Sequence, residues 1–420
     1  MLSLRRFSFA LALFLGANLL LAAPIASTGE RLDETIERYR PLQCRESDSP
    51  LFQAKPNDVL QMQMIADFSH INTDTYSEDS GGDSGILSYR DEEGRWRYLP
   101  VFIWDRGNSR RDFCEWVPLR ILFQSPKLKE ALEKRVAGSL PFQERMVAMY
   151  QALKKKQGSK RPSKGVPQKK GLFRNLGDDI KLVTHCGKSS WRHVGGETRE
   201  EQEDRLLQEY YLYQVLGQMG SAIMKTRLAE ITYRDPKGNP LITRKAFFRE
   251  PRSRLAKRCG LSKRPYPGVP EKGFDETSWF QLELYNRFIY FRDYGRDGRN
   301  VNKLYRGDGW IIAGPYDFDL SGIIVPTYRP NSGTVEENLK NYFRPWIAYH
   351  DGDERALVQI HFMVENREKM RHVLDQSLLR KEKKEQMLHW FDSYMAELER
   401  FLERNRVLLP ALAERLEKSH

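Results

Sequence analysis

One stretch of the chain reads Asp293-Tyr-Gly-Arg-Asp297-Gly-Arg-Asn300-Val-Asn302-Lys-Leu-Tyr305, then Arg306-Gly-Asp-Gly309, then Trp310-Ile-Ile-Ala-Gly-Pro-Tyr316-Asp317-Phe-Asp319-Leu-Ser-Gly322. Two short apolar runs flank a glycine-containing turn, which predicts a β-hairpin. Carboxylate and amide side chains precede the first run and follow the second. Oxygen ligands of this kind suit Mg²⁺. Turns also favour Asp and Asn for conformational reasons, but the whole set, followed by Ser321-Gly322, favours a metal-dependent site.

A kinase-like site also needs a strand lysine for the nucleotide phosphates and a helix glutamate that holds this lysine. Lys181 lies in the apolar run 179–186, which predicts a buried strand. Glu209 lies on an amphipathic helix predicted over residues 205–216. A strand, a helix, two strands, a helix and the acidic hairpin follow one another as in a kinase core. This order favours the interpretation that Lys181 and Glu209 form a functional pair, although an isolated Lys or Glu is more often a solvated surface residue.

The rest of the pattern predicts an α+β fold. Strands are expected at residues 59–67, 85–90, 96–104 and 114–123, and the Asp-, Ser- and Gly-rich segment 76–84 is expected to be a loop. Residues 127–155 have helical periodicity, with a break at 138–141, and residues 334–420 are helical almost throughout. We therefore expect a mainly β N-terminal part that leads into a core with the kinase-like order of elements, and a helical C-terminal region; the resemblance described below implies that this core is an atypical kinase-like two-lobed fold.

The N-terminus predicts export. Arg5 and Arg6 precede an apolar run to Leu21 and then small residues, the pattern of a signal peptide over residues 1–26. A retained membrane anchor is the alternative, but the run is short for a span. We expect a periplasmic or secreted protein with no transmembrane span after cleavage. In that oxidising compartment its four cysteines allow two disulfides in three pairings, with free thiols as the alternative.

The net charge is +12, and residues 154–170 carry much of the excess. Their Lys, Pro, Gly and Ser composition predicts a basic linker or loop. It is a candidate contact for an anionic surface. No aromatic residue interrupts it, so no nucleic-acid partner is expected.

These patterns divide the chain into six parts. The expected ranges are a signal peptide over 1–26, a mainly β region over 27–153, the basic linker over 154–170, strands and a helix of a kinase-like N-lobe over 171–255, a catalytic-loop-like and metal-hairpin region over 256–333, and C-terminal helices over 334–420.

Several quoted segments carry a family resemblance. Arg106-Gly-Asn-Ser-Arg110, the strand at Pro118-Leu-Arg-Ile121, Lys181-Leu-Val-Thr-His185, the helix with Glu209 and Tyr316-Asp-Phe-Asp-Leu-Ser-Gly322 resemble the secreted kinase-like proteins of the CotH type and their bacterial relatives. The resemblance covers roughly residues 60–326. It implies an atypical kinase fold that binds ATP and Mg²⁺ and phosphorylates a secreted protein or envelope substrate.

The resemblance also implies residue roles. Asp293 or Asp297 would be the catalytic base; Asn302 stands five residues after Asp297, the spacing of the kinase loop. Asn300 or Asn302 would be the amide ligand of the metal. Asp317 and Asp319 would be the carboxylate ligands, while Lys181 and Glu209 would form the pair on the phosphate side.

The sequence departs from the family pattern in two places. Tyr290-Phe-Arg-Asp293 stands where Gly-Asn-x-Asp is expected, and no glycine-rich phosphate loop precedes Lys181. A non-catalytic envelope pseudokinase or partner-binding protein is therefore the main alternative. Asp317-x-Asp319 after an apolar run also resembles the Asp-x-Asp of phosphatases and glycosyltransferases, but the strands that a parallel α/β domain would need do not follow it.

Overall fold

The computed structural model describes residues 38–73, 82–106, 116–158, 162, 164–185, 198–324 and 334–405. The predicted signal peptide, Cys114 and Cys186 lie outside these residues. The strands are β1 Leu60–Ile65, β2 Gly82–Arg90, β3 Trp96–Asp105, β4 Leu119–Phe123, β5 Asp179–Val183, β6 Thr226–Arg234, β7 Pro240–Arg249, β8 Gly273–Phe274, β9 Val301–Tyr305 and β10 Trp310–Pro315.

The helical elements alternate with these strands and then fill the C-terminal part. They are η1 Pro50–Phe52, α2 Phe68–Thr73, α3 Pro126–Arg135, α4 Phe142–Gln157, α5 Arg199–Gly217, α6 Arg252–Arg258, α7 Glu276–Phe288, η2 Phe318–Leu320, α8 Val335–Asn338, η3 Leu339–Phe343, α9 Arg344–Tyr349, α10 Glu354–Glu365, α11 Arg367–Asp375 and α12 Lys381–Arg404. The predicted α+β class, with a large sheet and a C-terminal helical region, is confirmed. No helix in the described ranges has both the length and the apolar character needed to cross a membrane.

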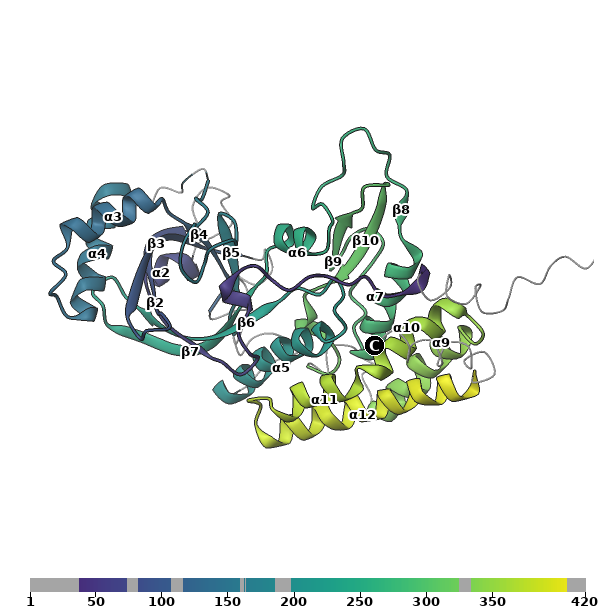
Figure 1. Cartoon of the computed structure of the whole chain (residues 1–420). Coiled ribbons are helices and arrows are strands. Elements are labelled where there is room, and N and C mark those ends of the chain that lie inside the picture. The colour runs from purple at the N-terminus through teal and green to yellow at the C-terminus, as the bar shows by residue number, and fades with distance from the viewer. Residues whose placement is uncertain are drawn as a thin grey trace, which may run out of the picture.

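Strands β1 to β7 form one closed sheet in the order β1-β2-β3-β4-β5-β7-β6. Strands β2 to β7 lie in the left half of Figure 1. All neighbours are antiparallel except β1 and β6, which are parallel. Successive side chains of a strand point to opposite faces, so Ile180 and Leu182 of β5 enter the interior cluster, while Val183 packs outside it. The two predicted regions 27–153 and 171–255 thus contribute strands to a single sheet.

The segment 76–84 was expected to be a loop, and this prediction is wrong at its end, because β2 begins at Gly82. The glycines there allow close strand approach. A Cβ at Gly82 would lie 2.5 Å from the Phe102 ring, and one at Gly85 would lie 2.7 Å from the carbonyl oxygen of Ile65. Glycine in a strand can mark such a contact as well as a turn. The remainder of the segment, 76–81, lies outside the described residues.

Helices α3 and α4 cover the outer side of the sheet near β2 and β3 (Figure 1). Lys154 and Tyr150 of α4 both reach the fully buried Asp83 of β2, the tyrosine hydroxyl at 3.0 Å. The prediction that residues 154–170 form a linker is therefore wrong at its start, where α4 continues to Gln157. Residues 164–170 belong to none of the helices and strands, as the loop alternative predicts, and the amide of Val166 donates to the Phe123 carbonyl at 2.9 Å.

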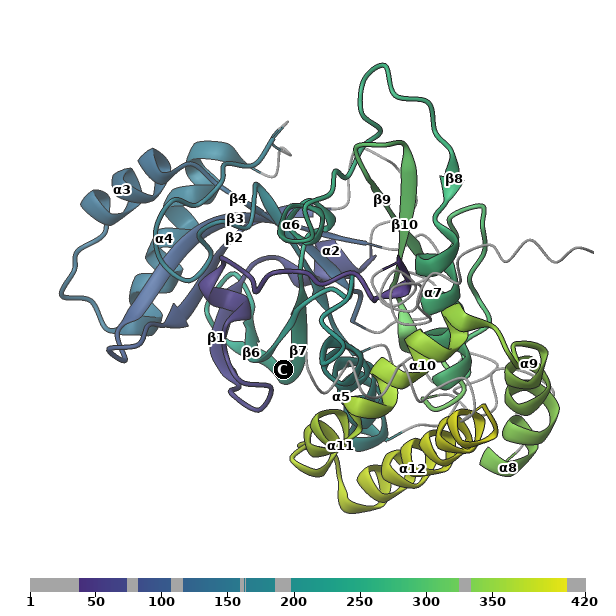
Figure 2. The ribbon, with the colours of Figure 1, turned by 45° about the vertical axis from the view of Figure 1, so that its right-hand side comes forward.

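Helix α5 is buried on nearly all its faces, although an amphipathic helix was predicted there. It lies between the closed sheet and the C-terminal helices, with β7 and α11 among its neighbours (Figure 2). Leu206, Leu212 and Leu216 belong to the largest apolar cluster. A helix placed between two layers has no solvent face to keep polar.

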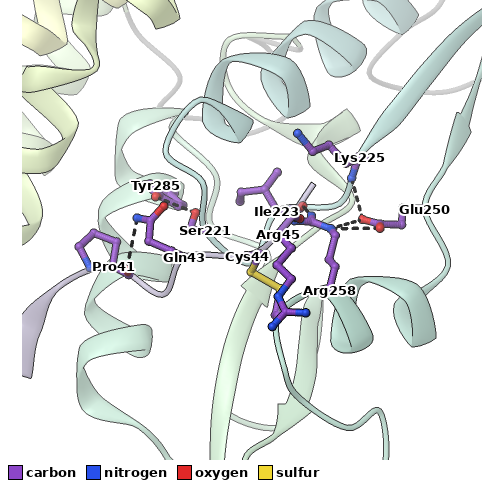
Figure 3. Close-up of a disulfide and its surroundings, with 11 residues drawn as sticks. Pro41, Gln43, Cys44, Arg45, Ser221, Ile223, Lys225, Glu250, Arg258 and Tyr285 are labelled. Carbon is purple, nitrogen blue, oxygen red and sulfur yellow. Dashed lines mark hydrogen bonds and ion pairs between the residues drawn. A yellow bond between two sulfur atoms is a disulfide. The ribbon is translucent and has the colours of Figure 1, made fainter. Parts of the chain in front are cut away.

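The second half of the described chain contains the three-stranded sheet β8-β10-β9, with β10 in the centre. Helix α7 packs against β10, and α8 to α12 form the helical layer beyond it (Figure 2). A disulfide between Cys44 and Cys259 ties the segment before β1 to the end of α6 (Figure 3). Beside it, Arg258 donates to the buried Glu250 carboxylate at 3.0 Å.

Candidate functional site

The β9–β10 hairpin, predicted from its pattern, is confirmed. Asn302 of β9 is the register partner of Gly314, and Val301 is the partner of Pro315. The residues just before β9 and just after β10 therefore meet at the same end of the hairpin. Asn300 and Asn302 come to this end from one strand, and Asp317 comes to it from the other.

Asp317 adopts a left-handed backbone conformation, with φ 67° and ψ 57°. This region costs a non-glycine residue about 1–2 kcal/mol. Two contacts hold it there. The Asp317 amide donates to the hydroxyl of Tyr213 at 2.9 Å, and its carboxylate accepts from Nη1 of Arg249 at 3.3 Å. The hairpin is thereby fastened to α5 and to the last residue of β7.

Arg249 is the central cation of this group, and its side chain is only 1% exposed. The guanidinium lies over the ring of Tyr316, 5.2 Å from its centroid. Burial opposes its charge, but the nearby oxygens of Tyr213, Asp317 and Glu209 outweigh burial and raise the pKa of Arg249 above its ordinary value. Glu209, one helical turn before Tyr213 on α5, is also buried. The helix glutamate, the strand cation and the hairpin aspartate thus form one electrostatic group.

Lys181 lies opposite Arg249, its register partner on β7. Within the described residues it forms no ion pair, so the structure does not bring Lys181 and Glu209 together as a pair; the cation coupled to Glu209 is Arg249. The Lys181 side chain is exposed, yet the protein around it desolvates the ammonium. This desolvation, with the neighbouring Arg249, Arg106 and Arg120, lowers the pKa of Lys181 to about 7.

The sequence pattern predicts a strand over residues 241–248, which ends one residue before Arg249, so sequence reasoning did not single out this arginine. The only available signal was an arginine at the end of the apolar run Ala246-Phe-Phe248, directly before Glu250 and Pro251. A proline shortly after an apolar run marks the end of a strand and the start of a turn. This signal does not show which carboxylates lie near the arginine in the folded protein.

The two candidate bases differ in their surroundings. Asn300, in a left-handed conformation with φ 49°, donates its amide to the backbone carbonyl of Asp293 at 2.7 Å and to its carboxylate at 3.1 Å. The Asp293 side chain is 29% exposed, whereas that of Asp297 is 66% exposed and accepts the amide of Arg299 within a turn. The side chain of Asp293 is therefore more firmly fixed than that of Asp297.

The remaining candidate ligands lie close to the hairpin in sequence. Asn302 is buried, and its Nδ2 has no hydrogen-bond partner among the described residues. Asp319 is half-buried within η2, directly after Asp317 and Phe318. The register places the Asn and Asp groups at one end of the hairpin, where each makes its own contacts.

Mg²⁺ would suit the types of residue in this group. In the part of the chain that the structure describes, no three His, Cys, Asp or Glu side chains gather as a metal cluster. Mg²⁺, however, is often held by one or two carboxylates together with phosphate oxygens and water. Asp317 and Asp319 offer carboxylates, and Asn300 keeps its Oδ1 as an acceptor because its nitrogen serves Asp293. Asp317 would share its carboxylate with Arg249.

A hollow of about 350 Å³ lies elsewhere, on α3 and α4, and is lined in part by Arg135, Leu140 and Lys155. It contains none of the predicted site residues.

Comparison of the sequence with models of known protein families finds no match, and a search of curated proteins finds none either. The functional assignment therefore depends on the residues and their geometry.

Proposed function

We propose that this chain is an exported kinase-like protein, periplasmic or secreted, that binds ATP and Mg²⁺ where the closed sheet meets the β9–β10 hairpin. It would transfer the γ-phosphoryl group to a hydroxyl of a protein or envelope substrate. The supporting observation is the group of Glu209, Arg249 and Asp317. The resemblance to CotH-type proteins implies a pair of Lys181 and Glu209 in a kinase-like core. In this group Arg249, the register partner of Lys181, is the strand cation that lies near Glu209 and Asp317.

Each residue has a role in the proposed reaction. Lys181 and Arg249 neutralise phosphate charge, and Asp317, Asp319 and an Asn oxygen would hold Mg²⁺. Bound Mg²⁺ would neutralise the phosphate oxygens. Asp293, or alternatively Asp297, accepts the proton of the substrate hydroxyl. The hydroxyl oxygen forms its bond to the γ-phosphorus while the bond to the bridging oxygen breaks, and ADP leaves.

A non-catalytic nucleotide-binding or partner-binding protein is the second candidate. The observation that favours it is the Arg249–Asp317 ion pair, because it engages a carboxylate that a catalytic metal would need. A phosphatase or glycosyltransferase with an Asp-x-Asp motif is less well supported. Strand β10 pairs antiparallel with β9, and the described elements after Asp319 are helical.

The first experiment is a thermal shift of the mature protein, beginning near Ser27, with ATP and Mg²⁺. A ligand at 100 times its Kd stabilises a protein by about 2.7 kcal/mol, so we expect a clear rise in Tm that EDTA abolishes. Asp317→Ala and Asp319→Ala should lose the Mg²⁺-dependent rise. Asp308→Ala, at the exposed hairpin turn, is the matched control and should keep it. A folded wild type without any rise would refute the ATP site.

Catalysis is tested separately by ADP formation and by transfer of labelled phosphate. Asp293→Asn should keep the thermal shift and lose about 10²–10⁴-fold in transfer rate, the usual contribution of a general base. Asp297→Asn should stay near wild type if Asp293 is the base. Nucleotide binding with no transfer to any offered acceptor or to the chain itself would favour the pseudokinase.

A further inference from the structure

We propose that a row of three cations on the outer face of the closed sheet, Arg120, Lys181 and Arg249, binds a chain of linked phosphates without a metal ion. The inference rests on the proposed function in one respect: the natural ligand would be the phosphate chain of the nucleotide. The row would take the place of the glycine-rich phosphate loop that the sequence lacks before Lys181.

The strand register forms the row. Arg120 of β4 is the partner of Lys181 of β5, and Lys181 is in turn the partner of Arg249 of β7. Residues directly opposite in antiparallel strands have side chains on the same face. Val183 and Phe247, two positions along β5 and β7, belong to the cluster outside the sheet interior. On β5 and β7 this outer face packs against the second half of the molecule, where Arg249 meets Asp317, and Arg120 continues the same face on β4.

The spacing of the row suits an extended anion. Neighbouring strands lie about 4.8 Å apart, so three of them span roughly 10 Å. One phosphate cannot contact both ends of such a row, whereas linked phosphates can. Next to Arg120, the row continues to Trp104 of β3, whose ring lies 5.0 Å from the Arg120 guanidinium carbon.

The members of the row still have donors to offer. Arg120 is 42% exposed, and its Nε pairs with Asp179 at the side of the row. Lys181 is exposed and has no ion pair among the described residues. Arg249 is buried, and its Nε and Nη2 have no hydrogen-bond partner in the described parts of the chain. The unpaired donors of Arg249 favour an anion beside them, because buried unpaired polar groups are costly.

The charges around Lys181 also favour an anionic ligand. Desolvation and three guanidinium groups, those of Arg249, Arg106 and Arg120, lower the pKa of its ammonium to about 7, whereas Asp179 opposes them. Positive charge therefore dominates at Lys181. A bound polyanion would reverse this balance, so Lys181 should take up a proton when the anion binds above pH 7.

The test uses inorganic tripolyphosphate with the mature full chain, in EDTA and at fixed ionic strength. Calorimetry should show binding to wild type, and Arg120→Gln and Lys181→Gln should each weaken it at least about tenfold. Lys237→Gln, an exposed lysine on the turn between β6 and β7, is the charge-matched control and should bind as wild type does. Inorganic phosphate should bind far more weakly than tripolyphosphate to the wild type.

Proton uptake is the second readout. Calorimetry at pH 8 in two buffers of different ionisation enthalpy should show uptake in wild type and in Arg120→Gln, but not in Lys181→Gln. The proposed polyphosphate site would be overturned if wild type and Arg120→Gln bound tripolyphosphate with equal affinity. It would also be overturned if the Lys237→Gln control lost as much affinity as the two site variants.

The two proposals can fail independently. In one outcome, tripolyphosphate binding depends on Arg120, but ATP has no Mg²⁺-dependent effect and no phosphate is transferred. This outcome would support the polyphosphate site and refute the proposed kinase function. In the opposite outcome, ATP raises the Tm in a Mg²⁺-dependent way, but tripolyphosphate binding is the same with and without the Arg120 and Lys181 substitutions. This outcome would support the kinase proposal and refute the polyphosphate site.

Discussion

His185 follows β5 by two residues, and its ring is buried, with Nδ1 lacking a partner among the described residues. Burial, and then the nearby charge of Arg199, lower the pKa of His185 to about 4. In the unfolded chain the value is about 6.5. As the pH falls below 6.5, the unfolded chain therefore takes up this proton before the folded protein does, and stability is lost towards pH 4.

Between pH 7.5 and pH 5 we expect this histidine alone to remove about 2 kcal/mol from the free energy of unfolding. Urea denaturation at the two pH values measures the loss. Because other groups also titrate, the readout is the difference between variants. His185→Gln should reduce the pH-dependent loss, whatever its effect at pH 7.5, and His389→Gln, exposed on α12, should leave it unchanged. The same pH dependence in both variants would contradict the assignment.

At the scale of elements, local patterns predicted much of what the structure contains. The alternation in β1, the β2–β3 pair and the hairpin β9–β10 could be read directly, because each depends on neighbouring residues. The parallel pairing of β1 with β6 could not, since it joins residues about 170 apart. The same limit explains why only part of the candidate site was predicted. Asn300 and Asp317 belong to one predicted hairpin, whereas Arg249 could be recognised only from the packing of β7 against α5 and the hairpin.

Gly322 shows how the end of this hairpin is held against the end of α7. Its amide donates to the Tyr290 carbonyl at 3.1 Å, and a Cβ at position 322 would lie 1.9 Å from Cδ1 of the Tyr290 ring. The chain that leaves Asp319 therefore lies against the chain that enters Asp293. Gly322 has a packing role, independent of any catalytic role of its neighbours.

Gly322→Ala should lower the free energy of unfolding by about 1–3 kcal/mol, the usual cost of adding a methyl group where none fits. Gly307→Ala is the control, because a Cβ there meets no atom within 4 Å and the backbone is not left-handed. Chemical denaturation of both variants measures the effect. An equal change in the two would mean that Tyr290 moves aside easily.

At the scale of the whole molecule, the Cys44–Cys259 disulfide joins positions 215 residues apart. Cys44 precedes the first strand of the closed sheet, and Cys259 follows its last strand, directly after α6. Backbone hydrogen bonds flank the bond, from Cys44 to Gly220 at 2.8 Å and from Arg45 to Arg258 at 3.0 Å. This bond belongs to one of the three pairings that four cysteines allow, while Cys114 and Cys186 lie outside the described residues.

Removing this bond should cost about 2–5 kcal/mol of stability, the range for native disulfides. Cys44→Ser and Cys259→Ser should each show the loss in denaturant unfolding. Because both substitutions break the same bond, the double variant should lose little more than either single variant. Thiol titration of the unfolded, unreduced protein should find one more free thiol in each single variant than in wild type. Additive losses, or single variants as stable as wild type, would show that the bond does not hold the segment before β1 to the end of α6 in solution.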